Sequence, residues 1–203
     1  YGKQKRKSAD GAGNPVELRS GMKRAELVNV LSQVVKGVRF LDNAFVAHSA
    51  LTHANITVMP ADATDLCDVK VVLTGITRPI VFYNVECDQM ITVKGFDPSI
   101  DAAIDPIDHL PIECFSPDFL AANLDTYSIG VMAYGMLRLR SPFNRMSQAR
   151  VLTAKQTEPV KLSLDKSEAE HGPLPSLIAT LTQPNQRKRL LVDDILNHAF
   201  FKA

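Results

Sequence analysis

The stretch His48-Ser49-Ala50-Leu51-Thr52-His53-Ala54-Asn55, followed by Leu73-Thr74-Gly75, decides how this chain is interpreted. Upstream of it, apolar residues recur at steps of three and four from Lys23 onward, which predicts an amphipathic helix of about five turns. Downstream, residues 56–59 and 69–73 are rich in β-branched side chains and predict two short strands, joined by a turn at 60–65. The polar stretch is therefore expected to form a loop between a long helix and a small β-hairpin.

The remainder of the chain is expected to be mainly helical. Residues 76–117 contain five prolines, which forbids a long regular element and predicts an irregular segment. Residues 128–139 are apolar nearly all round and predict a buried helix. Shorter helices are expected at 147–155, 174–181 and 192–196. The predicted fold class is mainly α with a small β-hairpin.

Two regions are predicted along the chain. Residues 1–22 are polar, with four basic residues between Lys3 and Lys7, and their composition favours a flexible linker or tail over a docking or cleavage site. Residues 23–203 form the folded domain, since 45% hydrophobic residues suffice for a core in a chain of 203. The chain begins with Tyr1 and shows no signal-peptide pattern, which predicts a processed chain or a fragment.

Charge and cysteine content argue against several classes of protein. The net charge is +1, so no overall field favours nucleic acid or a membrane surface. No run of ~18 apolar residues predicts a transmembrane segment. Cys67, Cys87 and Cys114 are odd in number and include no Cys-x-x-Cys pair, which disfavours zinc. We expect buried or incidental thiols, and the alternative is one disulfide whose pairing the sequence leaves open.

Motifs similar to those of eukaryotic protein kinases follow one another in the family's order over residues 26–201. The 48–55 loop resembles the catalytic loop, and Leu73-Thr74-Gly75 resembles the metal-binding Asp-Phe-Gly. Ser116-Pro117-Asp118 resembles the Ala-Pro-Glu that closes the activation segment, residues 125–130 (DTYSIG) resemble Asp-x-Trp-Ser-x-Gly, and residues 189–201 resemble the family's last arginine and final helix. The resemblance implies a protein kinase C-terminal lobe, part of an α+β kinase fold if an N-terminal lobe is present elsewhere.

The resemblance also implies structural roles for four residues. Asp118 and Arg189 match the positions that form a buried ion pair in the family. Asp125 either caps the buried helix or holds the backbone of the catalytic loop, and His48 anchors that loop. The scaffold of the family is therefore expected to be intact.

The residues that perform phosphoryl transfer are expected to be missing. In kinases the catalytic-loop aspartate accepts the substrate proton and the Asp-Phe-Gly aspartate holds magnesium. A neighbouring group could substitute, but Asp68 precedes its strand and should point away, which leaves His53. We expect a pseudokinase without enzymatic activity, catalytic residues or a metal site. The degenerate positions are His48, Ala50 (for the base), Thr52 (for a lysine), Asn55 (retained), Leu73 (for the aspartate) and Gly75.

The expected partner is another protein, or the domain's own N-lobe as a separate chain, because too few residues precede His48 to form that lobe. No cofactor is expected, and whether ATP binds is left open. Ser49 stands where kinases have the arginine that receives an activating phosphate. Segment 76–117 is therefore either a rigid, proline-braced binding surface or a disordered loop.

Residues 48–60 also look like those of secreted rhoptry-type pseudokinases of apicomplexan parasites, which would imply an exported protein with paired cysteines. The function predicted from the sequence is a catalytically inactive scaffold for protein interaction or allostery. Two alternatives are a nucleotide-binding enzyme of altered chemistry and a structural secreted wall or matrix protein.

Overall fold

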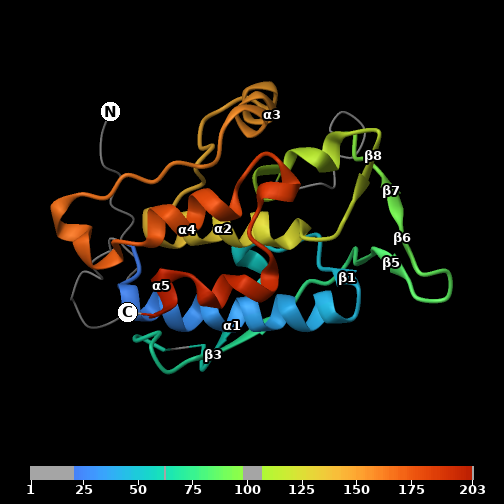
Figure 1. Ribbon diagram of the computed structural model, residues 1–203. Helices are drawn as coiled ribbons and strands as arrows, with labels where there is room; N and C mark the ends of the chain where they lie inside the picture. The colour runs from blue at the N-terminus through green and yellow to red at the C-terminus, as the bar shows by residue number, and fades with distance from the viewer. Residues whose placement is uncertain (1–20, 62, 98–106, 203) are drawn as a thin grey trace, which may run out of the picture.

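The computed structural model describes residues 21–61, 63–97 and 107–202 (Figure 1). Most of the predicted linker at 1–22, and the segment around Asp101 and Asp105, lie outside these residues. Within them, the fold is mainly helical with small antiparallel sheets, as the sequence predicted.

The first long helix, α1, spans Arg24–Asn43 and confirms the predicted amphipathic helix. The buried carboxylate of Glu26 accepts the backbone N–H of Lys23 at 2.9 Å, which satisfies one of the free donors at the helix start. The Arg24 guanidinium donates to the carbonyl oxygen of Phe200 at 2.8 Å and lies 5.6 Å from the centre of that ring. The start of α1 is thereby held against the last helix, α5 (Ala199–Lys202).

Helix α2 (Leu124–Arg138) lies in the middle of the molecule (Figure 1) and contacts both α1 and α4 (Leu174–Leu181). It begins four residues earlier than predicted, because Asn123 adopts a left-handed conformation (φ 60°) and the Thr126 hydroxyl donates to its carbonyl oxygen at 2.8 Å. Thirteen of its fifteen residues are buried, as expected of a helix that is apolar all round.

Strands β2 (Ile56–Met59) and β3 (Lys70–Leu73) form the predicted hairpin, with Ile56 opposite Leu73. The outer edge of β3 is covered by a side chain of α1. The Gln33 amide donates to the carbonyl of Val69 at 2.8 Å and accepts the N–H of Val71 at 3.0 Å, as a neighbouring strand would.

The prediction of a single hairpin and an irregular segment 76–117 is wrong, because three further two-stranded pairs are present. Pro79 and Pro117 stand directly before strands β4 and β8, where a missing N–H breaks no ladder. The pairs are β1 (Val46–Ala47) with β4 (Ile80–Val81), β5 (Tyr83–Asn84) with β6 (Gln89–Met90), and β7 (Thr92–Lys94) with β8 (Asp118–Leu120).

The remaining elements are short. The helix predicted at 147–155 is α3 (Gln148–Thr157), whereas the one predicted at 192–196 is a 3₁₀ helix. The 3₁₀ helices are η1 (His53–Asn55), η2 (Ile107–His109), η3 (Ile112–Phe115), η4 (Lys166–His171), η5 (Gln186–Lys188) and η6 (Val192–Asn197).

Two hydrophobic clusters support these elements. The larger joins α1, α2 and α4, and the smaller packs Phe82, Leu110, Cys114 and Phe119 beneath the short sheets. The thiols of Cys67, Cys87 and Cys114 are free. In the part of the chain that the structure describes, no helix combines the length and the apolar character needed to cross a membrane.

Candidate functional site

The 48–55 loop is fixed to the start of α2 by one buried carboxylate. Asp125 accepts the backbone N–H of His48 at 2.6 Å and that of Ser49 at 3.0 Å. Burial raises the pKa of Asp125, although both N–H groups act in the opposite direction. Of the two arrangements expected for Asp125, it therefore has the one that holds the loop, and Asn123 occupies the N-cap position of α2.

The His48 ring connects the loop to the end of β3. Its Nδ1 accepts the N–H of Ala50 at 3.3 Å, so Nε2 carries the proton and donates to the carbonyl of Thr74 at 2.9 Å. The ring is fully buried. Both ring nitrogens are used to position backbone, and neither faces a space in which a substrate could be held.

Asn55, predicted from the sequence as the retained metal-binding position, has its Nδ2 donor bonded within the loop. Its Nδ2 donates to the carbonyl of Ala50 at 2.6 Å, and its own carbonyl accepts the N–H of Thr74 at 2.9 Å. Gly75 has φ 68°, and a Cβ at Gly75 would lie 2.2 Å from Asn55 Oδ1. The close packing of these two residues requires glycine at position 75.

The Leu73 side chain packs closely against Gly37 of α1. A Cβ added at Gly37 would lie only 2.7 Å from Leu73 Cδ1. The side chain belongs to the margin of the larger core. Magnesium requires several oxygen ligands, and the matched positions supply a methyl group, an alkyl chain and one amide oxygen. Among the residues described, no three histidine, cysteine or carboxylate side chains are grouped so as to hold a metal. The residues present do not fit a magnesium ion.

His53 and Asp68 were considered as substitutes for the missing catalytic carboxylates. Neither side chain lies beside Ala50 and Leu73. Asp68 is exposed and precedes β3 at the end opposite Leu73. His53 faces α2, with Nε2 3.1 Å from the carbonyl oxygen of Met132 and its ring centre 5.6 Å from that of His109. Burial lowers the pKa of His53, and burial with the nearby His53 and Lys155 lowers the pKa of His109 to about 3. The His109 ring is therefore neutral at pH 7.

Lys155 of α3 is a functional candidate that the sequence did not indicate. Its ammonium group donates to the carbonyl oxygens of Ile107 (2.5 Å), Asp108 (3.0 Å) and Leu110. It also lies 5.2 Å from the ring centres of both Tyr127 and Phe143. The side chain is 2% exposed, and burial lowers the pKa of Lys155 to about 7. Lys155 thus fixes the end of segment 76–117 from α3.

The ion pair predicted between Asp118 and Arg189 is wrong. The buried Arg189 guanidinium binds Glu113, with Nη1–Oε1 2.6 Å and Nη2–Oε2 3.1 Å. Asp118 is exposed on β8, opposite Lys94. The motif Ser116-Pro117-Asp118 matched the family by its letters, but Pro111-Ile112-Glu113 supplies a proline and an acidic residue closer to the buried core. That second proline–acid spacing is the signal that could have identified Glu113.

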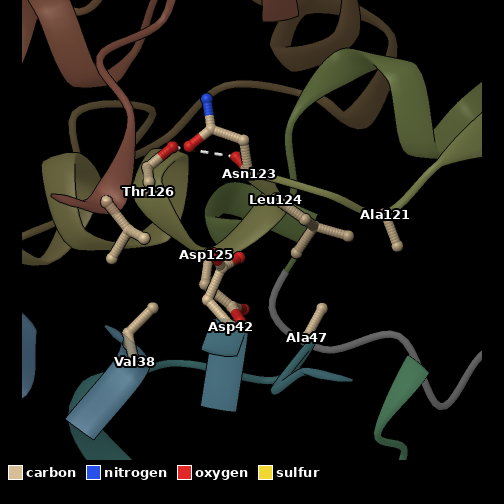
Figure 2. Close-up of a pocket in the computed structure, with 9 residues that line it drawn as sticks. Val38, Asp42, Ala47, Ala121, Asn123, Leu124, Asp125 and Thr126 are labelled. Carbon is tan, nitrogen blue, oxygen red and sulfur yellow. Dashed lines mark hydrogen bonds between the residues drawn. The ribbon is translucent and has the colours of Figure 1, made fainter. Parts of the chain in front are cut away.

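The best-formed pocket among the described residues is small. Figure 2 shows the Asp42 and Asp125 carboxylates side by side at its wall, with Val38 and Ala47 nearby. Burial and the neighbouring Asp193 raise the pKa of Asp42. The pocket has room for about one water molecule, which is too little for a nucleotide or a substrate side chain. It is a gap between the end of α1, Ala47 and the start of α2, and it adds no ligand site.

The comparison with known families accords with this architecture. A family model described as protein tyrosine and serine/threonine kinase matches residues 6–198, which is nearly the whole chain and includes α1, the 48–55 loop, α2 and Arg189. The match begins within the region predicted as a linker. On the strength of this match, the chain belongs to the protein tyrosine and serine/threonine kinase family.

Proposed function

We propose that this kinase-family domain transfers no phosphate and acts as a protein-interaction or allosteric scaffold. The observation that carries the proposal is the chemistry of the two decisive positions, Ala50 and Leu73, which have no proton acceptor and no oxygen ligand. Phosphoryl transfer depends on positioning and charge neutralisation by metal ions. Neither residue can provide these, and the single amide oxygen of Asn55 is too few ligands for a magnesium ion.

The contrast with the scaffold residues supports the proposal. Asp125 still holds the 48–55 loop through two N–H groups, and Arg189 still has a bidentate carboxylate partner. A domain that keeps these buried polar contacts retains a defined shape, since each would be costly to leave incomplete. Shape is what a binding scaffold requires.

Contacts within the chain hold both ends of segment 76–117 in the part that the structure describes. Ser49, at the position of the phosphate-receiving arginine, donates its hydroxyl to the carbonyl oxygen of Arg78. At the other end of the segment, Lys155 and Arg189 bind residues 107–113. These contacts need no phosphorylation, which supports a permanently formed surface over a switched one.

The test is phosphate transfer from radiolabelled ATP by the longest natural form of the protein, with magnesium or manganese, to itself and to generic protein substrates. We expect incorporation at the level of a protein-free control. Metal-dependent incorporation that Asn55→Ala abolishes would overturn the proposal.

Nucleotide binding is measured separately, by thermal unfolding of the same protein with ATP in the presence and absence of magnesium. A ligand at 100 times its Kd stabilises the folded state by about 2.7 kcal/mol. We expect no magnesium-dependent stabilisation. A magnesium-dependent shift would favour the altered enzyme, since it requires a metal site built from other residues.

A further inference from the structure

The connection from α2 to α3, with α3 itself, has an unusual distribution of charge. Residues 139–157 contain three arginines and one lysine and no acidic residue, although the whole chain has a net charge of only +1. Lys155 is the buried clamp described above. The three arginines, Arg140, Arg145 and Arg150, are all exposed.

Some of the described arginines form an ion pair with a carboxylate, and others, including Arg78 and Arg187, form none. Arg39, Arg138 and Arg189 each form an ion pair, with Asp193, Glu168 and Glu113 respectively. Arg140, Arg145 and Arg150 form none with any residue that the structure describes. Among the described residues, these three charges are therefore not neutralised by an ion pair.

Two large apolar side chains lie beside them in the chain and are also exposed. Leu139, which ends α2, is 63% exposed, and Met146, which precedes α3, is 45% exposed. Figure 1 shows α3 at the outer side of the molecule, on the far side of α2 from α1. We call Leu139, Arg140, Arg145, Met146 and Arg150 the arginine surface.

The arginine surface has a rigid support. The loop that contains it is closed by backbone hydrogen bonds from Asn144 to Ser141 (3.2 Å) and from Met146 to Phe143 (3.0 Å). Helix α3 buries only Val151 and Lys155, one turn apart, and Lys155 is fixed by three carbonyl groups. A surface that is formed before binding loses less conformational entropy when a partner docks.

We propose that the arginine surface is a docking site for an acidic segment of another protein that also presents apolar side chains. This inference rests on the proposed scaffold function and names the class of partner. Arginine forms paired hydrogen bonds with carboxylates, and Leu139 and Met146 offer apolar contact between the charges. Three arginines are fewer than the ~6–10 phosphate contacts of typical DNA binding, or the ~4–8 basic residues of a lipid-binding cluster.

The test uses fluorescence anisotropy with a labelled peptide of five Glu-Glu-Leu repeats, and its Lys-Lys-Leu counterpart, added to the full protein. The test variant combines Arg140→Glu, Arg145→Glu and Arg150→Glu. The matched control reverses three exposed charges elsewhere, Arg187→Glu, Lys188→Glu and Lys202→Glu. We expect the test variant to weaken binding of the acidic peptide by about tenfold or more, and the control to change it by less than about twofold.

Binding should also weaken as sodium chloride is raised from about 50 to 500 mM, because exposed charges are screened. Equal affinity of the test and control variants would overturn the proposal, as would equal binding of the basic peptide. Tighter binding of single-stranded DNA or phosphatidylserine vesicles would also overturn it, and so would self-association that the test variant abolishes. Phosphate transfer is assayed separately, so a failed docking site leaves the scaffold proposal standing.

Discussion

Arg189 and Glu113 join the end of segment 76–117 to the region before η6 through a bidentate ion pair, with Nη1–Oε1 2.6 Å and Nη2–Oε2 3.1 Å. The Arg189 side chain is fully buried, and its guanidinium lies 5.4 Å from the centre of the Tyr127 ring. Two segments far apart in the chain are therefore fixed to the central helix at one point.

Glu113→Ala should destabilise the protein strongly. It leaves the Arg189 charge buried without a carboxylate, and loss of one partner of such a pair costs about 3–5 kcal/mol. The measurement is the free energy of unfolding from urea denaturation. Asp118→Ala is the control, because Asp118 is exposed and should cost less than about 1 kcal/mol. An equal loss in both variants would restore Asp118 as the structural carboxylate.

Gly75 and Asn55 should be energetically coupled. Gly75→Ala places a methyl group against Asn55 Oδ1 and strains a positive φ, so we expect a loss of about 1–3 kcal/mol. Asn55→Ala removes the steric part but not the strain, so the double variant should lose less than the sum of the two single variants by about 1 kcal/mol. Urea denaturation of all four proteins measures the coupling. Strict additivity would show that the two side chains do not meet.

Lys155 should make stability rise with pH above neutrality. The pKa of Lys155 is about 7 in the folded protein, against an ordinary value of 10.5. Between these two pH values the lysine is protonated in the unfolded chain but largely neutral in the folded one. Unfolding then becomes less favourable as pH increases. Urea denaturation at several pH values in this window should give a smaller rise for Lys155→Met than for the wild type. Because Lys155 and Cys114 influence one another, the same comparison in a Cys114→Ala background isolates the lysine. Identical profiles would contradict a buried lysine.

His109 should contribute to acid unfolding. Its pKa is about 3 in the folded protein against an ordinary 6.5, so stability from its neutral form is complete above pH 6.5 and is lost as pH falls toward 3. Thermal unfolding across this range should show a smaller loss for His109→Gln, which does not titrate. An unchanged acid profile would place the ring in contact with solvent. Comparison with the wild type cancels the carboxylates that titrate in the same window.

The sequence predicted the elements that depend on periodicity. Helices α1 and α4 and the β2–β3 hairpin have patterns long enough for one face to be recognised, and their bounds were close to those found. The pairs formed by β1, β4, β5 and β6 are two residues long, and so short a strand has no measurable alternation. The prolines of segment 76–117 suggested irregularity. The sequence does not show that Pro79 and Pro117 stand just before strands rather than inside them.

The candidate site was predicted where a motif of the family identifies the residue, as it does for Asp125, which holds His48 from 77 positions away. The missing carboxylates at positions 50 and 73 are visible in the letters of the sequence. The partner of Arg189 and the surroundings of Lys155 depend on how η3 and α3 lie against α2, and neither placement has a local signal. A lysine in a short polar helix is usually exposed to solvent. The burial of Lys155 could therefore not be inferred from the sequence.

The contact between Arg24 and Phe200 has a consequence for the order of synthesis. The two residues are 176 positions apart, so the beginning of α1 is made long before the carbonyl that its first arginine binds. At ~5–20 residues per second, the interval on the ribosome is roughly 10–35 s. The first partner that α1 gains in that time is the β2–β3 hairpin, which follows it closely in the chain and is bonded by Gln33 of α1. The hairpin thus serves as an early brace for a helix whose contact with Phe200 forms only after a further 176 residues are made.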